Sequence, residues 1–158
     1  MKNLIKVLPL IAALTLTGCK KDQKADQLIE DTNLVEAPAA ATQEEMVKEA
    51  QSNPLTTLAL SESNFEFGKV KKGEHVQHVY EVTNTGKNPL IISQVKPGCG
   101  CTVPDYTHEP ILPGQKGSIT LKFDSSNFDG LVNKQAEVYA NVEKAPIVIT
   151  FSADVQPK

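Results

Sequence analysis

The 158-residue sequence has no tryptophan, few other aromatic residues and only three cysteines. The scarcity of aromatic side chains argues against a surface that binds sugars by stacking. The formal net charge of −3 is mild, and no basic tract of the kind that binds nucleic acid is present. The apolar run at residues 7–16 is about half of the ~20 residues that a membrane-spanning helix requires. Together these shortages predict a protein that binds no nucleic acid and whose apolar N-terminal run is too short to span a membrane.

Motifs that mark common enzyme active sites are also missing. The sequence holds no nucleophile elbow, no phosphate-binding loop and no HExxH zinc motif. Acid–base catalysis by paired carboxylates needs two facing groups in different environments. No such pattern is visible among the loop carboxylates, which we interpret as solvated charges: Asp105, Glu109, Asp124 and Asp129. We therefore expect no enzymatic activity and no bound cofactor.

The N-terminal segment has the layout of a secretory signal. Lys2 and Lys6 precede the apolar run 7–16, and the sequence Leu-Thr-Gly-Cys then ends at Cys19. These four residues resemble the lipobox of bacterial lipoproteins, in which the cysteine sulfur carries a diacylglyceryl group. Several acyl chains would hold the protein on a membrane, since each buried methylene contributes ~0.8 kcal/mol. We expect a lipid anchor at Cys19 in the cell envelope, and Lys20 in place of an aspartate favours the outer membrane.

Composition divides the chain into three parts. We predict a lipoprotein signal peptide at 1–18, a lipid-anchored flexible tether at 19–53 and one folded domain at 54–158. The tether is rich in Gln, Glu, Asp, Lys and Ala, and it has too few large apolar residues to offset the entropy of ordering. Within it, residues 42–45 (TQEE) fit a helix capping box, which predicts a short helix that forms only in part on its own.

The predicted domain shows apolar residues that alternate with a period of two, the pattern of half-buried β-strands. Turn signals such as Lys72-Gly73, Asn84-Thr85-Gly86 and Pro113-Gly114 separate these segments, and no long helical pattern intervenes. About seven short strands at this spacing predict an all-β fold, an immunoglobulin-like antiparallel β-sandwich. The expected strand segments are 58–60, 65–67, 76–82, 90–92, 119–123, 136–142 and 147–155.

Several motifs follow one another through this domain. They are Phe65-Glu66-Phe67-Gly68, Lys72-Gly73-Glu74, His78, Asn84-Thr85-Gly86, Pro89-Leu90, Cys99-Gly100-Cys101-Thr102-Val103-Pro104, and Pro113-Gly114 with Gly117. In this order and spacing they resemble bacterial domain-of-unknown-function family 1573, immunoglobulin-like domains often found on lipoproteins. The resemblance implies the sandwich fold. It implies no activity, because none is established for the family and a fold alone does not supply one.

Cys99 and Cys101 are the candidate chemical site, and their spacing leaves three interpretations open. As a disulfide they would lie at the upper edge of the allowed geometry, because alternate residues of an extended strand are roughly 6.6 Å apart. A bend at Gly100 would help closure, and such a bridge would be labile rather than a permanent staple. As thiolates the pair would suit a soft metal ion such as Cu(I). As thiols the two side chains would be small apolar groups packed at one end of the sandwich.

Histidines are the candidate helpers of this pair, although none has ligand spacing to it. His108 follows in an expected loop at 104–110 and could approach the sulfurs from there. His78 lies on the apolar face of its expected strand, so we interpret it as a core histidine with a hydrogen-bond partner. His75 faces the other way and should be solvated.

Two hypotheses of function follow. The leading one is a cell-envelope module, lipid-anchored through Cys19, that binds an envelope protein or another surface partner or has a structural role. The alternative is a copper-handling or thiol-redox protein that uses Cys99 and Cys101. Exposure of the two sulfurs separates the hypotheses, because buried sulfurs without a cationic neighbour are inert.

Overall fold

The computed structural model describes residues 41–158. The predicted signal peptide and the first part of the predicted tether, including Cys19, lie outside the described residues. No helix within 41–158 is long and apolar enough to cross a membrane. The elements are α1 (Gln43–Ala50), β1 (Leu58–Leu60), β2 (Asn64–Lys71), β3 (His75–Asn84), β4 (Ile92–Pro97), β5 (Thr102–Tyr106), β6 (Lys116–Asp124), β7 (Gly130–Ala140) and β8 (Ile147–Gln156).

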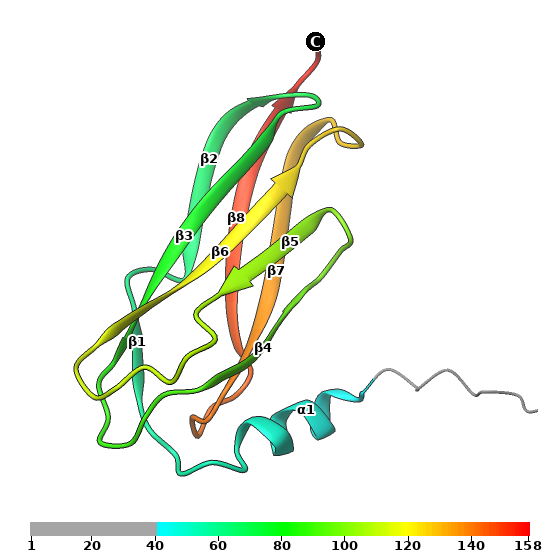
Figure 1. Ribbon diagram of the computed structural model, residues 1–158. Coiled ribbons are helices and arrows are strands. Elements are labelled where there is room, and N and C mark those ends of the chain that lie inside the picture. Colours follow the sequence, from blue (N-terminus) through cyan, green and yellow to red (C-terminus); the bar gives the residue numbers. More distant parts are fainter. Residues whose placement is uncertain (1–40) are drawn as a thin grey trace, which may run out of the picture. The chain divides into compact units, whose positions relative to one another are not determined.

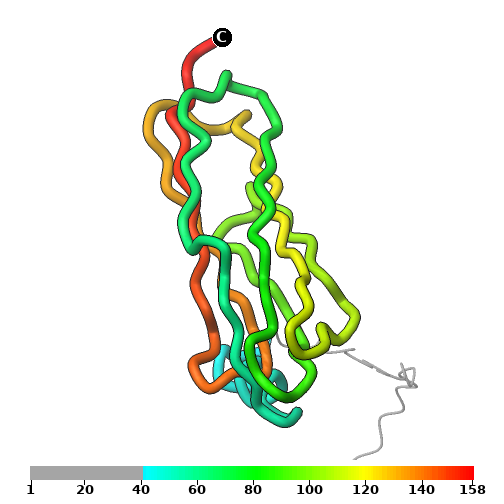
Figure 2. The backbone as a smooth tube through the Cα atoms, turned by 90° about the vertical axis from the view of Figure 1, so that its left-hand side faces the viewer, coloured from blue at the N-terminus to red at the C-terminus, as the bar shows by residue number. Residues whose placement is uncertain are grey.

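The strands form two layers that pack face to face (Figure 1). One four-stranded sheet has the order β1-β3-β6-β5, and the other has the order β2-β8-β7-β4. Figure 2, turned by a quarter, shows the two layers beside each other. The all-β sandwich predicted from the alternating pattern is therefore confirmed.

One strand pair departs from the expected antiparallel arrangement. β2 runs parallel to β8, with Phe65 beside Phe151, whereas the other named strand pairs are antiparallel. The reason is that the chain changes sheets without reversing its direction. It leaves the edge of the first sheet after Leu60 and joins β8 at Asn64, opposite Thr150. This change of sheet leaves the first residues of β8 without a partner strand on that side.

The core lies between the sheets and follows the predicted alternation. Phe123 and Phe151 contact each other across the sheets, with ring centres 5.2 Å apart. The buried Tyr80 hydroxyl donates a hydrogen bond to the carbonyl of Thr150 at 2.8 Å, so its polar atom is satisfied. Burial of these faces stabilises the fold by ~25 cal/mol per Å² of apolar area. The largest completely buried side chains are Tyr80, Tyr139, Phe123, Phe151, Leu90, Ile119, Leu121 and Ile149.

The helix α1 packs on the outside of the second sheet, against β4 and β7. Met46 and Ala50 contact Tyr139, whose side chain points away from the core but is completely buried beneath the helix. The predicted capping box is present, because Thr42 Oγ1 accepts from the Glu45 N–H and the Glu45 carboxylate accepts from the Thr42 N–H. Packing on Tyr139 therefore supplies the stability that so short a helix lacks in isolation.

The segment that follows α1 is also fixed to the sandwich. Gln51 Nε2 donates hydrogen bonds to the carbonyls of Val142 and Glu143. The Thr56 N–H donates to the carbonyl of Asn141. Residues 43–53 thus differ from the flexible tether expected for 19–53, and the folded unit begins before residue 54.

Strand β5 lies partly within the segment expected to be a loop. The Asp124 N–H donates to the Cys101 carbonyl and the Thr107 N–H donates to the Ser118 carbonyl, which shows that odd-numbered residues of this segment face β6. Pro104, an even-numbered residue without an N–H, therefore faces the free edge of the sheet, where strands tolerate proline. The prediction of a loop from Pro104 onward was therefore wrong for the first residues, which belong to the edge strand β5.

The Asn-Thr-Gly motif has a structural role at the end of the sandwich. Asn84 Oδ1 accepts hydrogen bonds from the Thr56 hydroxyl and the Gly86 N–H, and its Nδ2 donates to the carbonyls of Asn88 and Ile111. A Cβ atom at Gly86 would overlap the Thr56 side chain, so only glycine allows this close approach. The motif therefore fastens the segment before β1 to the rest of the domain.

Candidate functional site

The cysteine pair forms the turn that connects the two sheets at one side of the sandwich. β4 is an edge strand of one sheet and ends at Pro97, while β5 is an edge strand of the other and begins at Thr102. A disulfide joins Cys99 and Cys101 in this turn, and their Cα atoms are 5.3 Å apart. This separation is shorter than the roughly 6.6 Å of an extended strand, because the backbone turns at Gly100. Of the three interpretations of the pair, the structure contains the disulfide.

Main-chain hydrogen bonds hold both sides of the turn independently of the disulfide. The Gly98 N–H donates to the Gln135 carbonyl of β7 at 2.9 Å. On the other side, the Asp124 N–H of β6 donates to the Cys101 carbonyl at 3.0 Å. The β4–β7 and β5–β6 ladders therefore position the two cysteines, and the S–S bond is not needed to keep the strands in place.

A buried hydroxyl group lies beside both sulfurs. Thr102 is only 3% exposed, and its Oγ1 is 3.8 Å from Sγ of Cys99 and 3.8 Å from Sγ of Cys101. A hydroxyl rotates its hydrogen toward whichever acceptor is stronger. If the disulfide opened, Thr102 would be placed to donate a hydrogen bond to a thiolate on either cysteine.

Two open hollows flank the disulfide, and both cysteines are half-buried. The hollow on the Cys99 side has a volume of about 470 Å³ and is bordered by the amide side chains of Asn64, Asn133 and Gln135 and by Lys134. The hollow on the Cys101 side has a volume of about 440 Å³ and is bordered by His75, Gln77, Val103, Lys122 and Asp124. Both cysteines are therefore open to an approaching molecule.

The surroundings of the two sulfurs differ. Cys101 packs against the hydrophobic core, whereas Cys99 borders the amide-lined hollow. Charged groups gather on the Cys101 side: hydrogen bonds from Ser126 hold the pKa of Asp124 below its ordinary value, and His75 Nε2 lies 3.4 Å from Asp124 Oδ1. Lys122 adds a cation to the same hollow. Each sulfur therefore borders a hollow that contains a lysine, and Cys101 differs from Cys99 in its packed inner side and in its nearby His75.

His78 lies on the opposite side of the sandwich from the disulfide. Its Nε2 is 2.9 Å from Glu62 Oε1, and its ring stacks on Phe65 with ring centres 3.5 Å apart. The β2–β3 side holds these residues, while the β4–β5 side holds the cysteine pair. His78 is thus a half-buried histidine with a hydrogen-bond partner, as interpreted from the sequence, and it does not lie beside the sulfurs.

His108 does not approach the cysteines either. It follows Tyr106 at the far end of β5 and contacts that ring, with centres 4.4 Å apart. At ~3.3 Å per residue, β5 places it roughly 20 Å from Cys101. The expectation that His108 reaches the sulfurs is wrong because a strand replaces the expected loop. His75, expected to be solvated and 71% exposed in its side chain, is the histidine that shares a hollow with Cys101.

The described residues offer few ligands for a metal ion near this turn. Within 41–158, no group of three or more His, Cys, Asp or Glu side chains is placed to hold one. In the disulfide, the sulfurs are bonded to each other and neither is a thiolate, the form that binds metals. A copper site would therefore require the reduced pair and further ligands from outside this group.

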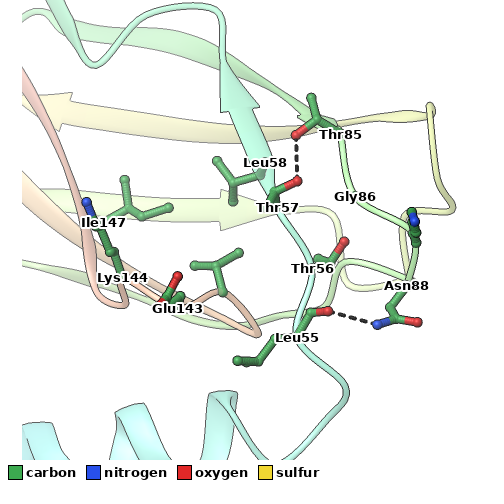
Figure 3. Close-up of a pocket in the computed structure, with 12 residues that line it drawn as sticks. Leu55, Thr56, Thr57, Leu58, Thr85, Gly86, Asn88, Glu143, Lys144 and Ile147 are labelled. Atoms are coloured by element: carbon green, nitrogen blue, oxygen red, sulfur yellow. Dashed lines mark hydrogen bonds between the residues drawn. The ribbon is translucent and has the colours of Figure 1, made fainter.

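A wider hollow lies where the chain enters β1, and we call it the β1–β8 groove (Figure 3). It has a volume of about 760 Å³ and is lined by residues 55–58, 85–88, 142–144 and 147. Leu58 of β1 and Ile147 of β8 project into it from opposite sides. The hydroxyls of Thr57 and Thr85 lie 3.0 Å apart along one wall. The groove thus combines apolar side chains with polar main-chain and hydroxyl groups.

A free strand edge lies next to the groove, directly after the lining residue Ile147 of β8. The Thr150 N–H donates to the Ser63 carbonyl, so the backbone groups of Thr150 point toward β2. Val148, two residues earlier in β8, has the same orientation. Because β2 begins at Asn64 opposite Thr150, it does not cover Val148, whose residue surface is 44% exposed. An extended segment could pair with this edge through main-chain hydrogen bonds.

The sequence pattern did not identify Thr102, Lys122 or Val148 as candidate site residues. Thr102 belongs to the Cys-Gly-Cys-Thr motif, so the sequence could have pointed to it. That its hydroxyl lies beside both sulfurs depends on the turn, which the sequence does not show. Lys122 reaches the site through the β5–β6 pairing, and β5 was not expected. The edge at Val148 arises from the change of sheet between β1 and β2, which alternation does not reveal.

Comparison with solved structures agrees with the sandwich fold. A protein of unknown function from Porphyromonas gingivalis W83 is similar with a TM-score of 0.56 and 17% identity, over 66% of this chain and 48% of that chain. The VesB protease of Vibrio cholerae is similar with a TM-score of 0.51 and 16% identity, over 61% of this chain and 31% of that one. This chain spans less than half the length of either protein, and at such identities the likeness shows the fold alone.

Curated proteins add no relative, since none matches this sequence. The family model described as "Protein of unknown function (DUF1573)" matches residues 58–155. This range runs from the start of β1 almost to the end of β8 and includes the cysteine turn. The chain belongs to the DUF1573 family.

Proposed function

We propose that this protein is a lipid-anchored binding module of the bacterial cell envelope, and that it binds an extended segment of another envelope protein. The observation that supports this most directly is the free edge of β8 at Val148, which follows Ile147 of the β1–β8 groove. An added strand gains affinity from main-chain hydrogen bonds and selectivity from the pockets that receive alternate side chains.

The groove suits an extended segment with apolar residues at alternate positions. Leu58 and Ile147 offer apolar contacts, and Leu55 is 47% exposed at the same site. The exposed Lys87 and Lys144 border the groove together with Glu143. A partner segment with an acidic residue beside its apolar ones would complement the two lysines.

The lipid anchor is supported by the sequence Leu-Thr-Gly-Cys ending at Cys19. Lysine at residue 20, rather than aspartate, favours the outer membrane. Within the described chain, the groove lies where the segment after α1 leads into β1. A partner held there would be kept at the membrane to which the lipid attaches this protein.

Site-specific photo-crosslinking in living cells tests the binding proposal. A photo-reactive residue at Lys144, in the groove, should give a crosslinked adduct of defined mass. The matched control is Leu131, which is 83% exposed and pairs with Asp154 far from the groove. Equal crosslinking from both positions, or none from Lys144, would count against the groove.

The variant Val148→Pro tests the strand edge itself. Proline removes the N–H of this free edge but leaves the ladder between β7 and β8 intact, because Val148 points its backbone away from β7. We expect the adduct from Lys144 to decrease at least about tenfold, the effect of losing one or two main-chain hydrogen bonds in a complex. An unchanged adduct would show that the partner does not pair with β8.

A further inference from the structure

The Cys99–Cys101 turn is a second site, separate from the β1–β8 groove. We propose that its disulfide undergoes thiol–disulfide exchange with the dithiol of a partner protein, and that Cys99 is the sulfur that is attacked. The inference rests on three observations: the turn keeps its backbone bonds without the disulfide, both cysteines border open hollows, and the two sulfurs have different surroundings.

The main-chain hydrogen bonds on either side of the turn make opening of the disulfide compatible with the fold. Gly98 is bonded to β7 and Cys101 is bonded to β6, so both strands keep their positions in the reduced state. The bridge encloses only Gly100, and so short a loop removes little entropy from the unfolded chain. A disulfide that contributes little to stability, in a half-exposed turn, has the properties of an exchange site rather than of a structural staple.

The direction of the exchange follows from the difference between the sulfurs. Both cysteines border a hollow, but Cys101 also packs against the core, which restricts the directions of attack on its sulfur, whereas Cys99 borders the hollow that opens past Asn133 and Gln135. A disulfide breaks faster when the leaving thiolate is stabilised. On Cys101, that stabilisation comes from Lys122 and His75, together with the Thr102 hydroxyl, which is equally close to both sulfurs.

The hollow beside Cys101 also contains a negative charge, the carboxylate of Asp124, but this carboxylate is already engaged by other groups. Asp124 is the carboxylate nearest to His75, and it is engaged by hydrogen bonds from Ser126 as well as by the histidine. Lys122 pairs in register with Val103 and forms no ion pair within residues 41–158, although Asp105 lies two residues further along the same face of β5. A thiolate on Cys101 therefore has a donor on its inner side and a cation on its outer side.

The exchange balances as two substitutions at sulfur. A thiolate of the partner attacks Sγ of Cys99, the S–S bond breaks, and its electron pair leaves on Cys101, which takes up a proton. The second thiolate of the partner then attacks the partner's first sulfur in the mixed disulfide, and Cys99 leaves as a thiolate that takes up a proton. The partner's dithiol is oxidised to a disulfide, and Cys99 and Cys101 are reduced to thiols with two electrons and two protons.

Reduction by dithiothreitol, used as a model dithiol, tests whether the site reacts in the folded protein. The full-length chain in detergent is exposed to the reagent, quenched with an alkylating agent and mapped by mass spectrometry, while circular dichroism follows the fold. We expect both cysteines to become alkylated with an unchanged β-type spectrum and an unfolding midpoint close to that of the oxidised protein. Alkylation that occurs only in denaturant would overturn the proposal.

The monothiol glutathione tests which sulfur is attacked. After brief exposure of the full-length chain and rapid alkylation, we expect glutathione on Cys99 and the alkyl group on Cys101. The opposite distribution, or an equal one, contradicts the assignment of Cys99 as the attacked sulfur. Because Cys19 lies in a different peptide, lipid or thiol at that residue does not affect the result.

Substitution of Thr102 tests the stabilisation of the leaving group. Thr102→Val removes the hydroxyl at nearly constant volume, and we expect the rate of reduction to fall about tenfold, the effect of one hydrogen bond to a charged group. Thr102→Ser keeps the hydroxyl and should restore most of the rate. A Val variant that folds normally and reacts at the wild-type rate would exclude this role for Thr102.

Lys122→Gln tests the outer cation in the same assay. Its matched control is Lys116→Gln, on the same face of β6 but paired with Glu81 at 2.7 Å and remote from the cysteines. We expect slower reduction in the first variant only, and a larger difference at low salt than at high salt. Equal rates in the two variants would show that Lys122 does not act on Cys101.

Discussion

At the scale of single residues, buried polar side chains fix loops that the sheets alone would leave free. Asn141 is completely buried, accepts a hydrogen bond from the Ile91 N–H, and donates to the carbonyls of Pro54 and Pro89. It therefore joins the segment before β1 to the loop before β4. With Asn84, it ties the loops at the end of the sandwich that contains the β1–β8 groove.

Replacing Asn141 should show this role directly. Asn141→Ala removes three hydrogen bonds to partly buried backbone groups, and we expect the free energy of unfolding to fall by about 3 kcal/mol. The control is Asn133→Ala, because Asn133 is exposed on β7 and should change stability by less than about 0.5 kcal/mol. Urea unfolding of the full chain measures both. Similar losses for the two variants would contradict the bracing role.

Two buried tyrosines predict how stability responds to alkaline pH. Burial, with a smaller effect of Glu62, raises the pKa of Tyr80 to about 12, and burial together with the hydrogen bond to Glu137 raises the pKa of Tyr139 to about 12. In the unfolded chain a tyrosine titrates near 10.0. Between these values the unfolded state loses protons that the folded state retains, so stability is complete below pH 10 and falls as pH rises toward 12.

Tyr139→Phe provides the measurement for this prediction. The variant lacks one of the two shifted groups, so its unfolding free energy should fall less steeply with pH in the alkaline range than that of the wild type. The slope, rather than the absolute stability, is compared because the substitution also removes the hydrogen bond to Glu137. Parallel slopes would mean that Tyr139 is not protected in the folded state.

At the scale of elements, α1 is held by few contacts and is the easiest part of the described chain to release. Met46→Ala removes the main side chain that packs on Tyr139, and we expect a loss of at most about 3 kcal/mol. The loss is limited because the helix can detach while the sandwich stays folded. Lys48→Ala on the exposed face is the control.

Chemical labelling of Tyr139 measures release of the helix. Nitration mapped by mass spectrometry should increase at Tyr139 in the Met46→Ala variant and stay at the wild-type level in Lys48→Ala. Tyr80, in the core, should remain protected in both. If Tyr139 stays protected in Met46→Ala, α1 is held by other contacts, such as those of Gln51.

The elements also show what the sequence alone could predict. Strict alternation identified the central strands because β3, β6, β7 and β8 each bury one face. β5 was missed because Pro104 is a breaker in most contexts and is tolerated only at a sheet edge. The parallel pairing of β2 with β8 was missed because local alternation carries no information about which sheet a strand joins. The capping box identified α1, but its packing on Tyr139 depends on long-range contacts.

The candidate site was predictable in its residues and unpredictable in its surroundings. Cys99 and Cys101 stand out by their spacing, and a turn at Gly100 was the condition under which they could bond. The helpers were not predictable, because Thr102, Lys122 and His75 meet the sulfurs through the pairing of β5, β6 and β3. The β1–β8 groove had no sequence signal, since it results from an absent strand rather than from a motif.

At the scale of the whole molecule, the proposed lipid anchor determines where these surfaces operate. We expect Cys19→Ala to move the protein from the membrane to the soluble fraction, because the variant lacks the sulfur that would carry the lipid. Detergent phase partitioning and incorporation of labelled fatty acid measure this. The double variant Cys99→Ala/Cys101→Ala should stay with the membrane, and wild-type fractionation of Cys19→Ala would contradict the anchor.

The position of the β1–β8 groove also determines how the domain would carry mechanical load. The groove lies where the segment after α1 enters β1, while the C-terminus is at the other end of the strands (Figure 1). A pull between the N-terminal side of α1 and a partner in the groove would act on the short segment after α1 and on the first residues of β8, and the other strands would bear little tension. A pull toward the C-terminus would instead place the parallel β2–β8 ladder in shear, so that many hydrogen bonds would have to break together. Binding at the groove would therefore spare the sandwich from forces between membrane and partner.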